Sequence, residues 1–294
     1  MGGGGGTSGA DGASDAGTVL DGSVDGSGGE DDSGAVEPQG EIVIATGQMT
    51  PTGLAVDDDF VYWANSGDST IVRCPINGCD GAEPTLVASN VTNPRGLDVD
   101  TTTLYWMDSS GKGQKCPITG CTGVPQTVFQ VPEVNRALDL DVSGDHLYFA
   151  SWPSMGSCPV SGCVEEGPQL FARTSALAID SDGEALFVAT NAGIITCSLD
   201  NCDAQSDQVL LYEAPRRLGI ATDATHVYFG ESEYLGQDDS SVPSISRCPI
   251  MGCGDQSPEV LKDEDVSPFA IAVNATRIFF TNYDHGTVVS MPKP

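Results

Sequence analysis

The sequence predicts an all-β fold built from six copies of one unit, and three observations support that prediction. Ten cysteines form five pairs with the pattern C-x4-C, and the first members of the pairs are 42, 42, 39 and 51 residues apart. Four short apolar segments recur in the same order within each period. No segment shows the sustained spacing of an amphipathic helix. The pairs are Cys74/Cys79, Cys116/Cys121, Cys158/Cys163, Cys197/Cys202 and Cys248/Cys253.

Each period predicts four β-strands. The recurring segments are of the types "GLAVD", "FVYWAN", "TIVRCPI" and "TLVAS". They are short, rich in β-branched and aromatic residues, and bounded by Gly, Asp, Asn, Ser or Pro, as is typical of strands separated by turns. Four strands in a period of 42 residues is the size of one blade of a β-propeller.

The two ends of the sequence predict how the ring closes. A sixth copy, "TVVSMPKP", has Met291 at the position of the first cysteine, 43 residues after Cys248, and it ends after its third strand. The segment "EIVIATG" at 41–47 resembles the fourth-strand segments and can complete this last blade. We therefore predict a six-bladed β-propeller over residues 41–294, closed by strand 41–47. An open solenoid and a seven-bladed ring are the alternatives.

Residues 1–40 predict a disordered, acidic tether. This stretch is rich in Gly, Ser, Ala and Asp and contains no Lys, Arg, Cys or aromatic residue. It cannot bury enough apolar surface to offset the loss of chain entropy on folding.

Charge and hydropathy exclude two classes of partner. The formal net charge is -30, which repels nucleic acid and anionic lipid. No apolar run approaches the roughly 18 residues of a transmembrane helix. We therefore expect no nucleic-acid partner and no transmembrane segment. We also expect a monomer whose partner is a protein or a small anionic ligand, for which the arginines described below are the candidate residues.

The cysteine pairs predict disulfide bonds rather than metal sites. A tetrahedral zinc site of four thiolates needs two pairs, so five pairs leave one over, and equivalent pairs lie on different blades. A disulfide needs only the hairpin that each pair encloses. Disulfides indicate an oxidising compartment, so we expect an extracellular or periplasmic location. The Gly- and Ser-rich leader also suggests an outer-surface lipid anchor on a removed N-terminal segment.

The second-strand segments resemble a known repeat family. "YWAN" at Tyr62–Asn65 and "YWMD" at Tyr105–Asp108 resemble the YWTD repeats of lipoprotein receptors, whereas "YFAS", "FVAT", "YFGE" and "FFTN" in the later units depart from them. This resemblance implies a six-bladed propeller that binds proteins or ligands without catalysis. The paired cysteines are not part of that repeat, and they are similar to those of cysteine-bearing propellers in bacterial surface lipoproteins.

Arginines and aromatic residues predict a binding face. In a propeller the innermost strands line a central channel, and the arginines stand within a few residues of the starts of these strands. Loops between second and third strands emerge on the same face and carry aromatic residues. An Arg fork binds carboxylates well, and aromatic residues are common interface anchors. Ion pairs with Asp of neighbouring blades are the alternative for the arginines. The candidates are Arg95, Arg136, Arg173, Arg216, Arg217, Trp152, Tyr234, Tyr283 and His285.

Two carboxylates are expected beneath that face. Asp98 and Asp139 stand where we align Ala55, Ala178, Gly219 and Ala272 of the other units, beside the channel. Their oxygens suit an amine, a hydroxyl or Ca²⁺, and no other cofactor is predicted. If both face one open position, a metal-dependent hydrolase or lyase is the alternative function. If each accepts a backbone N–H of the next blade, they are structural.

The three histidines do not predict a metal site. His146 and His226 precede second strands, whereas His285 lies between a second and a third strand. These two classes of loop emerge on opposite faces, so the three side chains are not expected to bind one metal ion.

The leading hypothesis is a non-enzymatic extracellular protein that binds its partner on the arginine-bearing face.

Overall fold

The computed structural model describes residues 1–2, 40–132, 134, 136–171, 176–200, 202, 209–213, 219–231 and 242–294. The chain divides into two compact units, Met1–Glu37 and Pro38–Pro294. The predicted tether lies outside the described residues, apart from residues 1, 2 and 40. Within the described ranges, no helix is long and apolar enough to cross a membrane.

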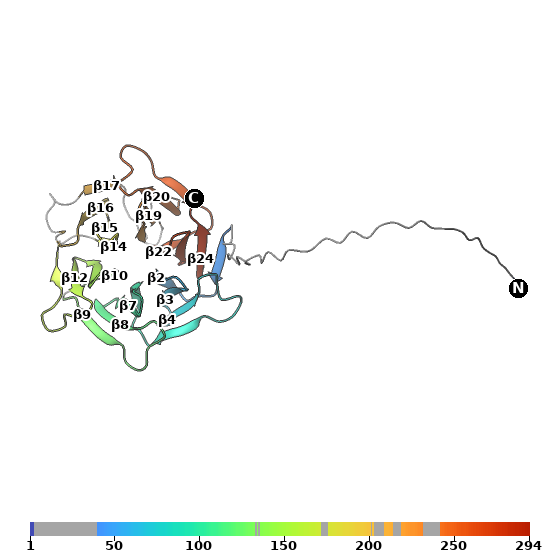
Figure 1. Ribbon diagram of the computed structural model, residues 1–294, viewed down its shortest axis with the longest axis horizontal. Helices are drawn as coiled ribbons and strands as arrows, with labels where there is room; N and C mark the ends of the chain where they lie inside the picture. Colours follow the sequence, from blue (N-terminus) through green and yellow to red (C-terminus); the bar gives the residue numbers. More distant parts are fainter. Residues whose placement is uncertain are drawn as a thin grey trace, which may run out of the picture. The chain divides into compact units, whose positions relative to one another are not determined.

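The second unit is a six-bladed β-propeller (Figure 1). Each blade is a four-stranded antiparallel sheet whose strands follow chain order from the channel outward, except in the last blade, where β1 is outermost. Blades 1 to 3 contain β2 (Pro51–Val56), β3 (Phe60–Asn65), β4 (Thr70–Pro75) and β5 (Thr85–Ser89); β6 (Pro94–Val99), β7 (Thr103–Asp108), β8 (Lys112–Pro117) and β9 (Gln126–Gln130); and β10 (Arg136–Ser143), β11 (His146–Trp152), β12 (Met155–Pro159) and β13 (Gln169–Leu170). Blades 4 to 6 contain β14 (Ala176–Ser181), β15 (Ala185–Thr190), β16 (Gly193–Ser198) and β17 (Val209–Glu213); β18 (Ile220–Thr222), β19 (His226–Glu231), β20 (Ser244–Pro249) and β21 (Glu259–Lys262); and β22 (Pro268–Val273), β23 (Arg277–Asn282), β24 (Thr287–Pro292) and β1 (Ile42–Ala45).

The N-terminal strand closes the ring, as the sequence predicts. β1 pairs antiparallel with β24, with Ile42 opposite Ser290. Arg277, only 1% exposed, reinforces this closure. Its guanidinium donates to the carbonyl oxygens of Gly40, at 2.8 Å, and Ser290, at 3.1 Å. One buried cation therefore binds both the beginning and the end of the closed sheet.

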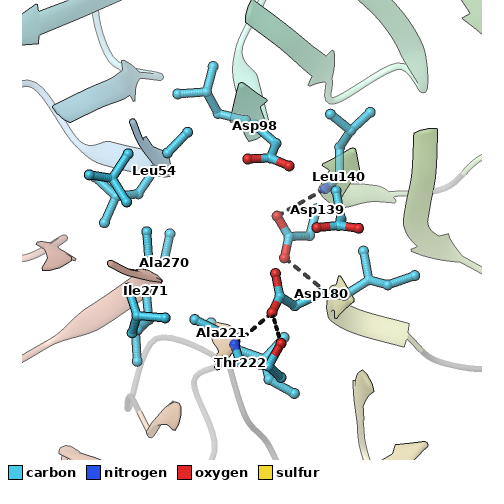
Figure 2. A pocket seen from close by; sticks show the side chains of 18 residues that line it. Leu54, Asp98, Asp139, Leu140, Asp180, Ala221, Thr222, Ala270 and Ile271 are labelled. Carbon is cyan, nitrogen blue, oxygen red and sulfur yellow. Dashed lines mark hydrogen bonds between the residues drawn. The ribbon is translucent and has the colours of Figure 1, made fainter. Parts of the chain in front are cut away.

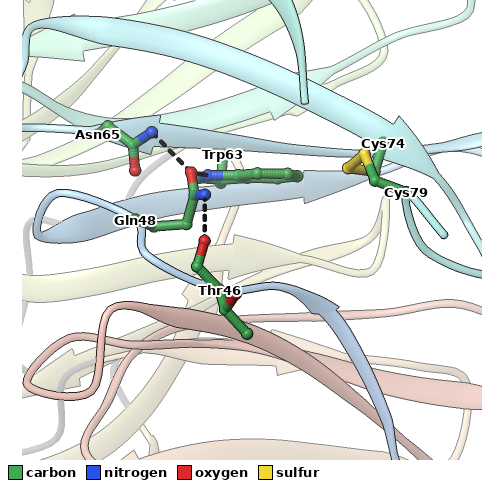
Figure 3. The surroundings of a disulfide bond; sticks show 6 residues. All are labelled: Thr46, Gln48, Trp63, Asn65, Cys74 and Cys79. Carbon is green, nitrogen blue, oxygen red and sulfur yellow. Dashed lines mark hydrogen bonds between the residues drawn. A yellow bond between two sulfur atoms is a disulfide. The ribbon is translucent and has the colours of Figure 1, made fainter. Parts of the chain in front are cut away.

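The chain that leaves the closing strand is bound to the first blade (Figure 3). The side-chain oxygen of Gln48 accepts hydrogen bonds from the indole of Trp63 and the amide of Asn65, both at 2.9 Å. Trp63 is fully buried and packs in one cluster with Cys74 of the first disulfide. Gln48 therefore fixes the connection from the last blade to blade 1.

The hydrophobic core lies between the blades. Six buried clusters each combine residues of two neighbouring blades; one, for example, joins Tyr62 of blade 1 with Trp106 of blade 2. Inner strands approach so closely that Gly96 is required. A Cβ at this position would lie 2.3 Å from the backbone nitrogen of Leu140. Packing between neighbouring blades therefore holds the ring together.

All ten cysteines form the five predicted disulfides, with Cα separations of 5.1 to 5.9 Å. Each bond closes the hairpin between the third and fourth strands of its own blade. The bonds join Cys74 to Cys79, Cys116 to Cys121, Cys158 to Cys163, Cys197 to Cys202 and Cys248 to Cys253.

The second cysteines have a further role beyond closing their own hairpins. Cys79 and Cys253 are only partly buried, whereas their partners Cys74 and Cys248 are 0% and 2% exposed. The first cysteine ends a core strand, and the second stands in the turn, where its amide donates to the outer strand of the preceding blade. The disulfide hairpins therefore link blades to one another. These bonds run from Cys79 to Ile44 at 3.4 Å, Cys121 to Val87 at 2.9 Å, Cys163 to Val128 at 2.8 Å and Cys253 to Leu211 at 3.2 Å.

Candidate binding site at the central channel

The inner strands give the channel two different ends. We call the face where they begin the entry face and the face where they end the exit face. Arg95 and Arg136 are near the entry face, since they are among the first residues of β6 and β10. A cavity of about 110 Å³ lies toward the exit face, lined by second halves of the inner strands, including Val56 and Val273.

Three consecutive blades place a carboxylate at the same position of this cavity. Asp98, Asp141 and Asp180 lie opposite the first aromatic residue of the second strand, which is Tyr105, Tyr148 or Phe187. The other blades have Ala at this position. Figure 2 shows Asp98, Asp139 and Asp180 on one side of the channel, with Leu54, Ala270 and Ile271 on the other. The cavity therefore has one acidic and one apolar half.

This register corrects the predicted alignment of the units. Asp139 is not the counterpart of Asp98, because it lies opposite Ala150, two positions before Asp141. Ala178 and Gly219 were likewise aligned two positions too early; Asp180 and Ala221 occupy the equivalent places. The number of residues between the start of the inner strand and this position differs between the units, from three after Arg95 to five after Arg136, so counting from the preceding turn fails. The signal that identifies Asp141 and Asp180 is their constant spacing of seven residues before the aromatic position.

The carboxylates accept backbone N–H groups of the next blade. Asp98 accepts from Val142 at 2.7 Å and Asp139 from Ile179 at 3.1 Å. Asp180 accepts from the backbone and hydroxyl of Thr222, at 2.6 and 2.5 Å. This is the arrangement that we expected of structural carboxylates. Among the described residues, no group of three or more His, Cys, Asp or Glu is placed to hold a metal ion.

Burial strongly perturbs these acids. It raises the pKa of Asp98 to about 7, of Asp139 to about 8 and of Asp180 to about 6, and the neighbouring carboxylates add to the first two shifts. Burial and the charges of Asp180 and Asp98 raise the pKa of Asp141 well above its ordinary value. The cavity therefore holds fewer than four negative charges near neutral pH.

Arg95 extends across the entry end of the channel. Its guanidinium carbon lies 5.7 Å from the ring centre of Phe269, which belongs to blade 6, so the side chain crosses blade 1. Gly53 permits the close approach, since a Cβ there would lie 1.9 Å from the carbonyl oxygen of Arg95. Phe269 in turn stacks on Tyr283, with ring centres 5.5 Å apart. Sequence reasoning missed Phe269, because the contact depends on the curvature of the ring.

Two nitrogens of Arg95, Nε and Nη1, are buried and donate to no acceptor among the described residues. A buried donor without an acceptor costs about 1–3 kcal/mol. The predicted pairing of Arg95 with an Asp of a neighbouring blade is therefore absent from the described part of the chain. The guanidinium instead lies beside an aromatic pair.

Of the other predicted site residues, Arg136, Trp152 and His285 lie in the described part of the chain and four do not. Arg136 lies opposite Trp152 in the β10–β11 pair, and 46% of the Trp152 surface is exposed. His285 is exposed between β23 and β24, whereas His146 and His226 begin β11 and β19 at the exit end, as the sequence predicts. Arg173, Arg216, Arg217 and Tyr234 lie outside the described residues.

Neither a known protein family nor a curated protein matches the chain. Similar solved structures include a gluconolactonase from Xanthomonas campestris, with 12% identity, a TM-score of 0.67 and coverage of 86% of this chain and 89% of that one. They also include a calcium-binding protein, regucalcin, from Agrobacterium tumefaciens, with 15% identity, a TM-score of 0.63 and coverage of 86% and 92%. A virginiamycin B lyase from Staphylococcus aureus has 12% identity, a TM-score of 0.59 and coverage of 86% and 98%. At these identities the similarity shows the fold alone.

Proposed function

We propose that this protein is a non-enzymatic, extracellular or periplasmic binding propeller that takes an anionic group of a partner on its entry face. The observation that carries this proposal is the pair of buried nitrogens of Arg95 without an acceptor. A carboxylate accepts strong, charge-assisted hydrogen bonds from a guanidinium, so it would neutralise the charge and supply an acceptor for a donor that lacks one. The bound group would lie at the mouth of the channel.

Neighbouring side chains support a binding surface at this mouth. Phe269 and Tyr283 form a stacked pair beside Arg95, and Arg136 lies next to the exposed Trp152. Aromatic and arginine side chains are the commonest anchors of protein interfaces. The net charge of -30 disfavours free anions. We therefore infer a protein partner whose basic surface presents an exposed carboxylate.

The disulfides support an oxidising location, since such bonds persist outside the reducing cytosol. The lipid anchor and membership of the YWTD or surface-lipoprotein families stay predictions. A Ca²⁺ site and a metal-dependent hydrolase or lyase activity in the channel remain the alternative prediction. The carboxylate oxygens that accept backbone N–H groups favour the binding function.

The test compares Arg95→Lys with Arg247→Lys, a control on the third strand of blade 5. Both proteins are used to capture partners from the native cell surface, and melting is measured in acetate and chloride at equal ionic strength. Acetate at high concentration should stabilise the wild type by supplying a carboxylate to Arg95. We expect Arg95→Lys to weaken capture about 10- to 100-fold, as for the loss of a charge-assisted hydrogen bond, and to remove this stabilisation. Equal capture by wild type and Arg95→Lys, with equal acetate response, would refute the proposal.

A further inference from the structure

Ion pairs between neighbouring blades gather at one junction of the described ring. Lys293 of blade 6 lies 2.6 Å from Asp223 of blade 5, and Lys262 of blade 5 lies 2.9 Å from Glu41, which leads into the outer strand of blade 6. Among the described residues, no other Lys or Arg ion pair joins two blades. We call the junction of blades 5 and 6 the ionic seam.

The other five junctions have a disulfide hairpin instead. At four of them the amide of the second cysteine donates to the outer strand of the preceding blade. At the junction of blades 3 and 4, Cys202 is fully buried in one cluster with Met155 and Phe171 of blade 3. A covalently closed hairpin loses its contact with the neighbouring blade less easily, because its own conformation is fixed.

The ionic seam lacks this covalent device. Its hydrophobic cluster contains no cysteine, and Met291 packs there at the cysteine position. Leu261 is the counterpart of Val87 and Val128, which lie buried under hairpins, yet Leu261 is only partly buried. Where the other blades have a disulfide-closed turn, this blade has Lys293 after its third strand.

Lys293 replaces the hairpin with charge. Its ammonium donates to Asp223 and lies 5.1 Å from the ring centre of Tyr228, also in blade 5. Burial by itself raises the pKa of Asp223, but hydrogen bonds from Lys293, Thr225 and Tyr228 outweigh it and lower that pKa below its ordinary value. The carboxylate of Asp223 is therefore charged near neutral pH when it is bound to Lys293.

We propose that the ring opens first at the ionic seam, where Lys293–Asp223 and Lys262–Glu41 act as an electrostatic latch in place of a disulfide hairpin. The seam borders the channel cavity, because Thr222 of blade 5 and Val273 of blade 6 both line it. Opening of the seam exposes this wall of the cavity to solvent. Local opening is expected where covalent and packing restraints are weakest.

Asp223→Asn tests the latch, and Asp100→Asn is its matched control. Both aspartates cap the turn before a second strand and accept a tyrosine hydroxyl, from Tyr228 or Tyr105, but only Asp223 meets a lysine. Asparagine keeps one acceptor for the turn and removes the charge. In the full chain with intact disulfides, we expect Asp223→Asn to speed hydrogen exchange about tenfold in β21 and β24. Asp100→Asn should leave these strands unchanged.

A second pair separates the latch from a general loss of stability. Lys293→Met should reproduce the change, whereas Lys115→Met removes a cation that donates to Val160 at a disulfide junction and should not. Added salt should speed exchange at the seam of the wild type and have little effect in Lys293→Met. Equal exchange in Asp223→Asn and wild type, equal acceleration at all junctions, or the same salt response in Lys293→Met would each overturn the proposal.

Discussion

Replacement of Asp139 by asparagine should stabilise the protein at high pH and change it little at pH 5. The pKa of Asp139 rises from 3.8 to about 8, first through burial and then through the charges of Asp180 and Asp98. Because folding raises this pKa, the contribution of Asp139 to stability is fully present below about pH 4. It is lost as the pH rises to about 8. One pKa unit corresponds to about 1.4 kcal/mol, so the charged form costs on the order of 5 kcal/mol at pH 9.

The asparagine variant avoids this cost and introduces a smaller one. Asp139 accepts backbone hydrogen bonds from Leu140 at 3.0 Å and Ile179 at 3.1 Å, and an amide oxygen replaces only one of its two carboxylate oxygens. Loss of one such bond costs about 1 kcal/mol. At pH 5 the cost of burying Asp139 is only about 2 kcal/mol, nearly balanced by the lost bond. The net gain at pH 9 is therefore at most about 4 kcal/mol.

Urea unfolding at pH 5, 7 and 9 measures this difference, with fluorescence of the buried Trp63 and Trp106 as the signal. The control is Asp58→Asn at an exposed turn position, which removes the same chemical group from the surface. We expect the free energy of unfolding of Asp139→Asn to fall less steeply with pH than that of the control. If the two variants have parallel pH profiles, the channel carboxylates carry no burial penalty and our account of the cavity is wrong.

Two further substitutions test the packing and closure of the ring. Gly96→Ala should destabilise by about 3 kcal/mol or more in urea unfolding, because the new Cβ would lie within 2.5 Å of the blade 3 backbone, whereas Gly40→Ala meets no atom within 4 Å and should be neutral. Arg277→Met should cost about 3 kcal/mol and expose the N-terminal strand to proteolysis, because it removes the buried donor shared by Gly40 and Ser290. Proteolysis that begins elsewhere would show that Arg277 does not hold the closure.

Much of the fold was predictable because the repeats carry local signals. Each unit repeats strand-forming segments and turn residues, and the C-x4-C pairs enclose their own hairpins. The leftover strand at 41–47 could close the ring only by pairing with the last blade, and β1 does so. The candidate site was predicted less well. Arg95 and Asp98 reach the channel, but Asp141 and Asp180 were missed, because the number of residues between the start of an inner strand and the channel position differs between the units.

The six blades, the strand order, the disulfides and the closing strand were predictable from the sequence, because these depend on segments whose partners lie within one repeat or at its ends. Which groups meet across the ring became known from the folded structure. The backbone amides of Cys79 and Cys253 donate hydrogen bonds to the preceding blade, and the contact of Arg95 with Phe269 spans a whole blade. The acidic half of the cavity forms because the same position on three neighbouring inner strands lines it. Such contacts depend on the curvature and tilt of the blades, which no local pattern encodes.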